Sequence, residues 1–101
     1  MRVVYLPEAR EELLAAVEFY LDCEDGEDGL ATDFYRELQK AVRDIIEAPE
    51  LWGSIGKGFR RKLMHRFPFG VIYHLIDADV IEIVAVAHQK RRPGYWSKRD
   101  Y

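Results

Sequence analysis

The stretch VIYHLIDADVIEIVAVAH, residues 71–88, places two apolar segments on either side of a short acidic segment. Residues 71–76 and 80–88 are rich in β-branched and aromatic side chains, which favour strands. The segment DAD at residues 77–79 has the composition of a turn. The sequence therefore predicts a β-hairpin, and the second strand, which is the most apolar of the chain, is expected at the centre of the sheet.

The register of this hairpin predicts which side chains share a face of the sheet. With a three-residue turn, His74 opposes Glu82 and Ile72 opposes Val84 on one face. The other face then holds Tyr73, Leu75, Ile81 and Ile83. Both faces of the sheet are therefore expected to be largely apolar.

A third strand is predicted just upstream, at residues 59–67, followed by a turn at residues 68–70. If that turn also has three residues, Leu63 and Phe67 lie on the same face as Tyr73 and Ile83, which is the face expected to pack against helices. The opposite, open side then carries Arg60, Lys62, Met64, Arg66, His74, Glu82 and His88. A slip of one residue would exchange the two faces of this strand.

The first half of the chain predicts a short strand and two helices. Residues 3–6 are prone to form a strand, and Pro7 suits the first position of a helix. Apolar residues then recur at steps of three and four until residues 22–29, and again over residues 29–48 until Pro49. The fold class is therefore α+β, with an N-terminal strand and an αα-hairpin packed on one face of an antiparallel β-sheet.

Length and composition indicate a single small domain. The chain has 101 residues, of which 49% are apolar, enough for one hydrophobic core over residues 1–101 but not for two. No apolar run approaches the roughly 20 residues of a membrane-spanning helix, and the segment before Pro7 is too short for a secretory signal. The one cysteine, Cys23, cannot form an internal disulfide. We therefore expect a cytoplasmic protein with no membrane partner.

Charge is distributed unevenly along the chain. Residues 1–51 hold 14 acidic and 5 basic residues, a net charge of −9, whereas residues 52–101 hold 4 acidic and 10 basic residues, a net charge of +6. A basic face on the second half would attract anionic partners within a Debye length of about 8 to 10 Å. Attraction between the two halves would also stabilise the fold, although surface ion pairs contribute little.

Several segments together resemble the RelE/ParE superfamily of bacterial toxins. They are the helical hairpin, the run Arg66-Phe67-Pro68-Phe69, the strand ending at His88, and the closing segment Arg92-Pro93-Gly94-Tyr95-Trp96. The resemblance implies a toxin of a type II toxin–antitoxin pair, held inactive by an antitoxin whose extended segment wraps it. It also implies a helical hairpin on one face of a curved antiparallel sheet, and a possible higher-order toxin–antitoxin oligomer.

The chemistry of this superfamily divides into two branches. Ribosome-dependent mRNA nucleases resemble this chain but place arginines near Gly70 and Gln89, where this chain has none. A rearranged nuclease site remains an alternative, with candidate catalytic residues Arg66, His88, Arg91 and Tyr95, supported by Lys62. The ParE-like branch, whose members bind and inhibit DNA gyrase, fits the turn and the closing segment better. We therefore favour a protein-binding toxin over an enzyme.

The predicted binding surface for the target or the antitoxin is basic. Its members are Arg60, Lys62, Arg66, His88, Arg91, Arg92, Tyr95 and Arg99. For Arg60, Arg61, Lys62 or Arg66 taken singly, protection of a sheet edge is the better explanation, and only the cluster favours a partner. Tyr95 and Trp96 are better explained by anchoring of the C-terminal segment against the helices. The three histidines lack a short ligand spacing, so we expect no metal and no other cofactor. A ribosome or mRNA target, and a degenerate toxin that retains only antitoxin or operator binding, stay open.

Overall fold

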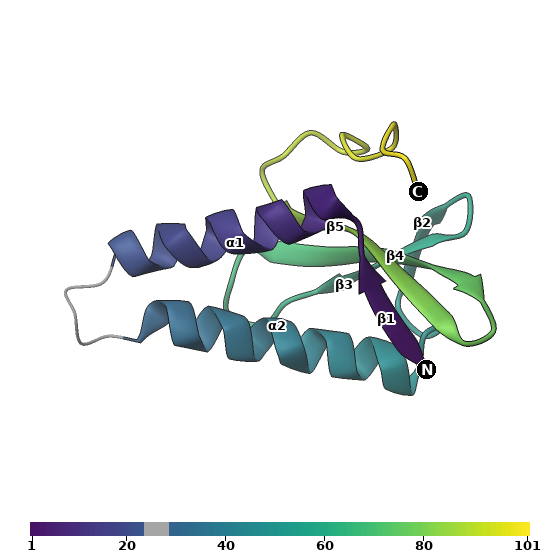
Figure 1. Cartoon of the computed structure of the whole chain (residues 1–101), viewed down its shortest axis with the longest axis horizontal. Helices are drawn as coiled ribbons and strands as arrows, with labels where there is room; N and C mark the ends of the chain where they lie inside the picture. The colour runs from purple at the N-terminus through teal and green to yellow at the C-terminus, as the bar shows by residue number, and fades with distance from the viewer. Residues whose placement is uncertain (24–28) are drawn as a thin grey trace.

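The computed structural model describes residues 1–23 and 29–101, and in these residues two helices pack against a five-stranded sheet (Figure 1). The elements are β1 (Arg2–Tyr5), α1 (Pro7–Asp22), α2 (Leu30–Glu47), β2 (Gly53–Gly56), β3 (Phe59–Leu63), β4 (Phe69–Asp77) and β5 (Val80–His88). The strand order is β1-β5-β4-β3-β2. The α+β class and the helical hairpin are confirmed, and β5 has a strand on each side, as predicted.

Strand β1 makes the sheet mixed, because it pairs in parallel with β5 while the other neighbours are antiparallel. Val3 lies beside Ile81 and Tyr5 beside Ile83. The N-terminal strand was predicted, but its parallel partner was not. Pro7 then begins α1 directly after β1, as expected from its restricted φ and missing N–H.

The β4–β5 hairpin has the predicted register only where residues 73–75 pair with residues 81–83, and it is shifted by one residue on either side of them. His74 opposes Glu82 and Tyr73 opposes Ile83. A β-bulge follows, so Ile72 opposes Ala85 and not Val84 as predicted. The extra residue on β5 reverses the alternation beyond it, and bulges of this kind increase the local twist of a sheet.

Strand β3 has the opposite orientation to the predicted one. It ends at Leu63, and a five-residue loop replaces the expected three-residue turn, so that Leu63 opposes Gly70 and Arg60 opposes Tyr73. Arg60 and Lys62 therefore face the helices, and Leu63 faces away from them. The physical reason is that Met64 and Phe67 leave the strand and are buried in the core, because burial of two large apolar side chains outweighs a longer strand.

Aromatic residues join the helices to the helix-facing side of the sheet. The Phe34 ring of α2 lies 5.4 Å from that of Phe67 and 5.2 Å from that of Phe69, and Tyr20 of α1 lies 5.0 Å from Phe67. Edge-to-face packing of this kind adds about 0.5 to 1.5 kcal/mol per pair beyond area burial. The sequence RFPF thus closes the loop and also fills the space under the helical hairpin.

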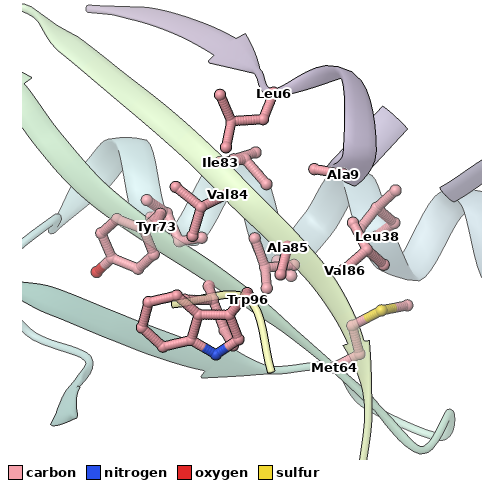
Figure 2. Close-up of a cluster of buried hydrophobic side chains, with 14 of the residues drawn as sticks. Leu6, Ala9, Leu38, Met64, Tyr73, Ile83, Val84, Ala85, Val86 and Trp96 are labelled. Atoms are coloured by element: carbon pink, nitrogen blue, oxygen red, sulfur yellow. The ribbon is translucent and has the colours of Figure 1, made fainter. Parts of the chain in front are cut away.

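The segment after β5, residues 89–101, here called the tail, covers part of the face that was expected to be open. In Figure 1 it runs from the end of β5 back toward β2. Trp96 is 8% exposed, and its ring lies 4.8 Å from that of Phe59, as does the ring of Tyr101. Figure 2 shows Trp96 on one side of β5, with Ala9 and Leu38 on the other. The core therefore lies on both sides of the sheet.

Neither helix in residues 1–23 and 29–101 combines the length and the apolar character that crossing a bilayer requires. The longer one, α2, carries charged residues along its exposed side, including Arg36, Lys40 and Glu47.

Candidate partner-binding groove

A groove of about 570 Å³ lies between the tail and the sheet face turned away from the helices, and we call it the tail groove. Phe59, Ile72 and Trp96 form its apolar floor, and all three are buried. The β2–β3 turn borders it on one side and residues 91–97 on the other. A hollow with an apolar floor and polar walls is the usual form of a binding site.

The charges around the tail groove are all positive. Lys57, Arg61, Arg91 and Arg92 line it and are exposed, and among the described residues no Asp or Glu lines it. Guanidinium groups at such positions pair readily with carboxylate or phosphate. In a chain with a net charge of −3, this groove is therefore a local region of positive charge.

Gly70 allows Arg61 to lie across the neighbouring strand. A Cβ atom at Gly70 would be 3.2 Å from Cγ and 3.3 Å from Cδ of Arg61, closer than ordinary contact. The stem of Arg61 therefore occupies the space that a side chain on β4 would fill.

Glu12 of α1 holds the tail in place. Its carboxylate accepts hydrogen bonds from the Tyr95 hydroxyl at 2.5 Å, from both terminal nitrogens of Arg99 at 2.8 Å, and from the Val86 backbone N–H at 3.0 Å. The Arg91 guanidinium is 3.9 Å from the same carboxylate and stacks on the Tyr95 ring at 3.8 Å from its centroid. One acidic residue thus positions one wall of the tail groove.

These contacts change the pKa values of Glu12 and Tyr95. Burial acts to raise the pKa of Glu12, but hydrogen bonds from Arg99, Tyr95 and Val86 outweigh it and lower that pKa below its ordinary value. Burial and the bond to Glu12 raise the pKa of Tyr95 well above its ordinary value. The Tyr95 hydroxyl therefore stays protonated at neutral pH and is unsuited to act as a general base.

A family model described as "ParE toxin of type II toxin-antitoxin system, parDE" matches residues 3–93 of this chain. The chain belongs to the ParE toxin family. This confirms the predicted RelE/ParE resemblance and its ParE-like branch. The family implies an antitoxin as partner.

A solved structure shares the fold of this ParE-family chain. A chain described as "Chromosomal ParDE TA system from P. aeruginosa" matches it with a TM-score of 0.70 and 16% sequence identity, over 87% of this chain and 95% of that chain. At this identity the likeness concerns the fold. No match was found among curated proteins.

Four of the eight predicted binding residues of this ParE-family chain line the tail groove. They are His88, Arg91, Arg92 and Tyr95. The prediction that the His88 side chain faces the open side was wrong. After the β5 bulge His88 opposes Phe69, and its ring lies 5.0 Å from the Phe69 ring. Their role in binding stays a prediction.

Three predicted residues, Arg60, Lys62 and Arg66, are not on the open side. Arg60 donates a hydrogen bond to the Trp52 carbonyl oxygen at 2.8 Å. Lys62 lies 3.7 Å from a carboxylate oxygen of Asp44 on α2 and 4.0 Å from the centroid of the Trp52 ring. Their placement was wrong for the same reason as the register of β3, since its loop is longer than expected.

Arg66 lies in the β3–β4 loop, and its guanidinium is 3.3 Å from a carboxylate oxygen of Asp33 on α2. Arg99, in contrast, is only 14% exposed at its side chain and is occupied by Glu12 and the Val84 carbonyl oxygen. The candidate catalytic set is therefore not assembled. Arg91 and Tyr95 lie together, but Arg66 is held against the helices.

Sequence reasoning missed Arg61, Lys57 and Glu12 as contributors to the groove. The sequence did contain a signal for Arg61. Neighbouring residues on a strand point to opposite faces, so one of Arg60 and Arg61 had to face the open side. Glu12 falls three residues after Ala9 and four before Ala16, both buried in α1. A carboxylate on that apolar stripe requires a partner, but the sequence offers no indication that Arg99 supplies it.

Proposed function

We propose that this ParE-family toxin arrests growth by binding an acidic surface of a protein target in the tail groove, and that DNA gyrase is this target. The observation that carries the proposal is the charge of the groove. Four exposed cations, Lys57, Arg61, Arg91 and Arg92, surround an apolar floor with no acidic residue among the described lining residues. Complementary charge of this kind speeds association and selects the partner.

A catalytic role is less well supported by the same geometry. Cleavage of RNA at a 2′-hydroxyl needs a base and cations around one phosphate. Tyr95 has a raised pKa and donates a hydrogen bond to Glu12, while Arg66 is paired with Asp33. We therefore favour inhibition by binding over mRNA cleavage.

Neutralisation by a cognate antitoxin is the second part of the proposal. The antitoxin would prevent the target from reaching the tail groove, either by covering it or by holding the toxin in a larger complex. Release of the antitoxin would then restore growth arrest.

A gyrase supercoiling assay tests the proposal. The purified protein is expected to inhibit supercoiling, and the double variant Arg61→Glu with Arg92→Glu is expected to need at least a ten-fold higher concentration. The matched control is Arg36→Glu, an exposed arginine of α2 that lines no described groove. New mRNA ends in expressing cells, mapped by primer extension, together with no effect on gyrase, would replace the proposal by the nuclease alternative.

A further inference from the structure

The turn between β2 and β3 holds a lysine in a backbone conformation that lysine rarely adopts. Gly56 pairs with Phe59, so Lys57 and Gly58 alone connect the two strands. Their φ angles are 55° and 84°, and positive φ at both central residues is typical of a type I′ turn. Asn, Asp and Gly form such turns most readily. Lysine at the first central position is therefore an unfavourable choice for the turn itself.

The strain at this turn falls on Lys57, because Lys57 has a Cβ atom and Gly58 does not. In the left-handed region the Cβ atom comes too close to the following carbonyl oxygen. Of the described residues other than glycine, only Arg66 shares a positive φ. Strained backbone positions of this kind cluster at functional sites. The reason for a lysine at position 57 is therefore to be sought in its side chain.

The Lys57 side chain makes no contribution to the fold that would explain the strain. It is exposed, and within residues 1–23 and 29–101 its ammonium group has no hydrogen bond, ion pair or aromatic partner. Lys62, in contrast, lies 3.7 Å from a carboxylate oxygen of Asp44. Protection of a sheet edge does not account for Lys57 either, because it lies in the turn and not along the β2 edge.

The location of Lys57 supplies the missing reason. It lines the tail groove, across from Arg91 and Arg92. In Figure 1 the end of the tail lies near the β2–β3 hairpin, and the Tyr101 ring is 4.8 Å from that of Phe59. A two-residue turn leaves the backbone of Lys57 little freedom, so less entropy is lost when its ammonium group meets a partner.

We propose that Lys57 is a specificity-determining contact of the tail groove, where its ammonium group receives a carboxylate of the target, and that the strained turn is retained to hold it there. The identity of the target rests on the proposed function. The place of the contact rests on the turn, on the unpaired charge and on the groove.

The variant Lys57→Asn separates the needs of the turn from those of the contact. Asn suits the first central position of a type I′ turn, so the melting temperature is expected to rise by about 2 to 4 °C. The dissociation constant for gyrase, measured by surface plasmon resonance, is expected to rise at least five-fold because the charge is lost. A stabilised protein with weaker binding is the opposite of what a purely structural residue would give.

Two further variants serve as controls. Lys57→Arg keeps the charge and is expected to bind gyrase within two-fold of the original chain. Lys98→Asn removes one charge from an exposed tail position that does not line the groove, and it is expected to change neither binding nor melting temperature. Unchanged binding by Lys57→Asn, or a lower melting temperature, would overturn the proposal.

The dissociation rate distinguishes a contact from long-range attraction. A cation that only steers its partner changes mainly the association rate. Loss of the Lys57 contact is expected to raise the dissociation rate at least three-fold. A change confined to the association rate would show that Lys57 acts at a distance and would overturn the contact.

A labelled acidic peptide, fluorescein-Glu-Leu-Glu-Phe-Glu-Leu-Glu-amide, makes the test independent of gyrase. Its anisotropy is expected to rise on titration with the full chain, with at least five-fold weaker binding to Lys57→Asn and unchanged binding to Lys98→Asn. If the original chain does not bind gyrase, the proposed function fails and the peptide decides the role of Lys57. Equal binding of the peptide by the original chain and Lys57→Asn, or no binding by either, would then overturn that role.

Discussion

Glu12 shows how one side chain links distant parts of this chain. Its carboxylate lies on the apolar stripe of α1 and binds Tyr95 and Arg99, more than 80 residues away in sequence, as well as the backbone of Val86. A half-buried carboxylate without partners would be strongly destabilising. Here its negative charge is balanced by Arg99, and hydrogen bonds to ions are worth about 1.5 to 3 kcal/mol each.

The variant Glu12→Gln is expected to lower the free energy of unfolding at pH 7 by about 2 to 3 kcal/mol, because Arg99 then loses its charged partner. Urea unfolding measures this, with the exposed neighbour Glu11→Gln as control. A loss as small as that of the control would contradict a structural role for Glu12.

The stability of the protein is also expected to depend on pH through Glu12. Its pKa is lower in the folded state than its ordinary value of 4.5, so the ionised carboxylate stabilises the fold fully above about pH 4.5, and this contribution is lost as the pH falls through the folded pKa. Urea unfolding between about pH 6 and pH 3 should show this decline, and Glu12→Gln should show a smaller one.

At the scale of elements, the tail acts as a cover for the outer face of the sheet. It has no strand or helix of its own in the described structure, and it is held at two points, by Glu12 and by Trp96. Because Trp96 packs on Phe59, the tail is anchored to the sheet as well as to α1. The prediction that Tyr95 and Trp96 anchor it to the helices was thus correct for Tyr95 only.

Removal of the Trp96 side chain is expected to cost about 3 kcal/mol, because a large buried aromatic leaves a cavity over Phe59. Thermal unfolding of Trp96→Ala should then occur about 12 to 24 °C lower, whereas Lys98→Ala, at an exposed tail position, should change it little. A shift within a few degrees of the control would mean that the tail is not an integral part of the fold.

At the scale of the whole molecule, the described surface includes the tail groove, which is lined by exposed cations around an apolar floor. The net charge of −3 conceals this arrangement. Opposite charges on the two halves of the chain are used only in part for internal pairs such as Arg99 with Glu12 and Lys62 with Asp44. Exposed cations of the tail groove such as Lys57, Arg61 and Arg92 have no ion pair among the described residues and can attract acidic partners from solution.

Association with the target and with the antitoxin should therefore weaken with salt. Raising ionic strength from about 0.1 M to about 1 M shortens the Debye length from about 10 Å to about 3 Å, and we expect the association rate to fall at least ten-fold, as measured by surface plasmon resonance. The melting temperature should change far less, since surface ion pairs contribute little to stability. A salt-independent association rate would argue against electrostatic recognition at the tail groove.

Local patterns predicted much of this fold. The alternation in residues 71–88 and the helical spacing on either side of residues 22–29 depend only on neighbouring side chains, so the β4–β5 pairing and both helices could be read directly from the chain. The basic character of a binding surface was also predictable, because ten of the fifteen basic residues lie in the second half. The expected turn within residues 22–29 falls largely outside the described residues.

Which cations reach that surface was settled by long-range packing. Burial of Met64 and Phe67 lengthened one loop and turned Arg60 and Lys62 toward the helices, leaving Arg61 in the groove. The course of the tail likewise followed from contacts between residues far apart in sequence, above all Glu12 with Arg99. Periodicity is a property of neighbouring residues, whereas the choice of face and partner depends on which distant side chains bury the most apolar surface and balance each other's charge.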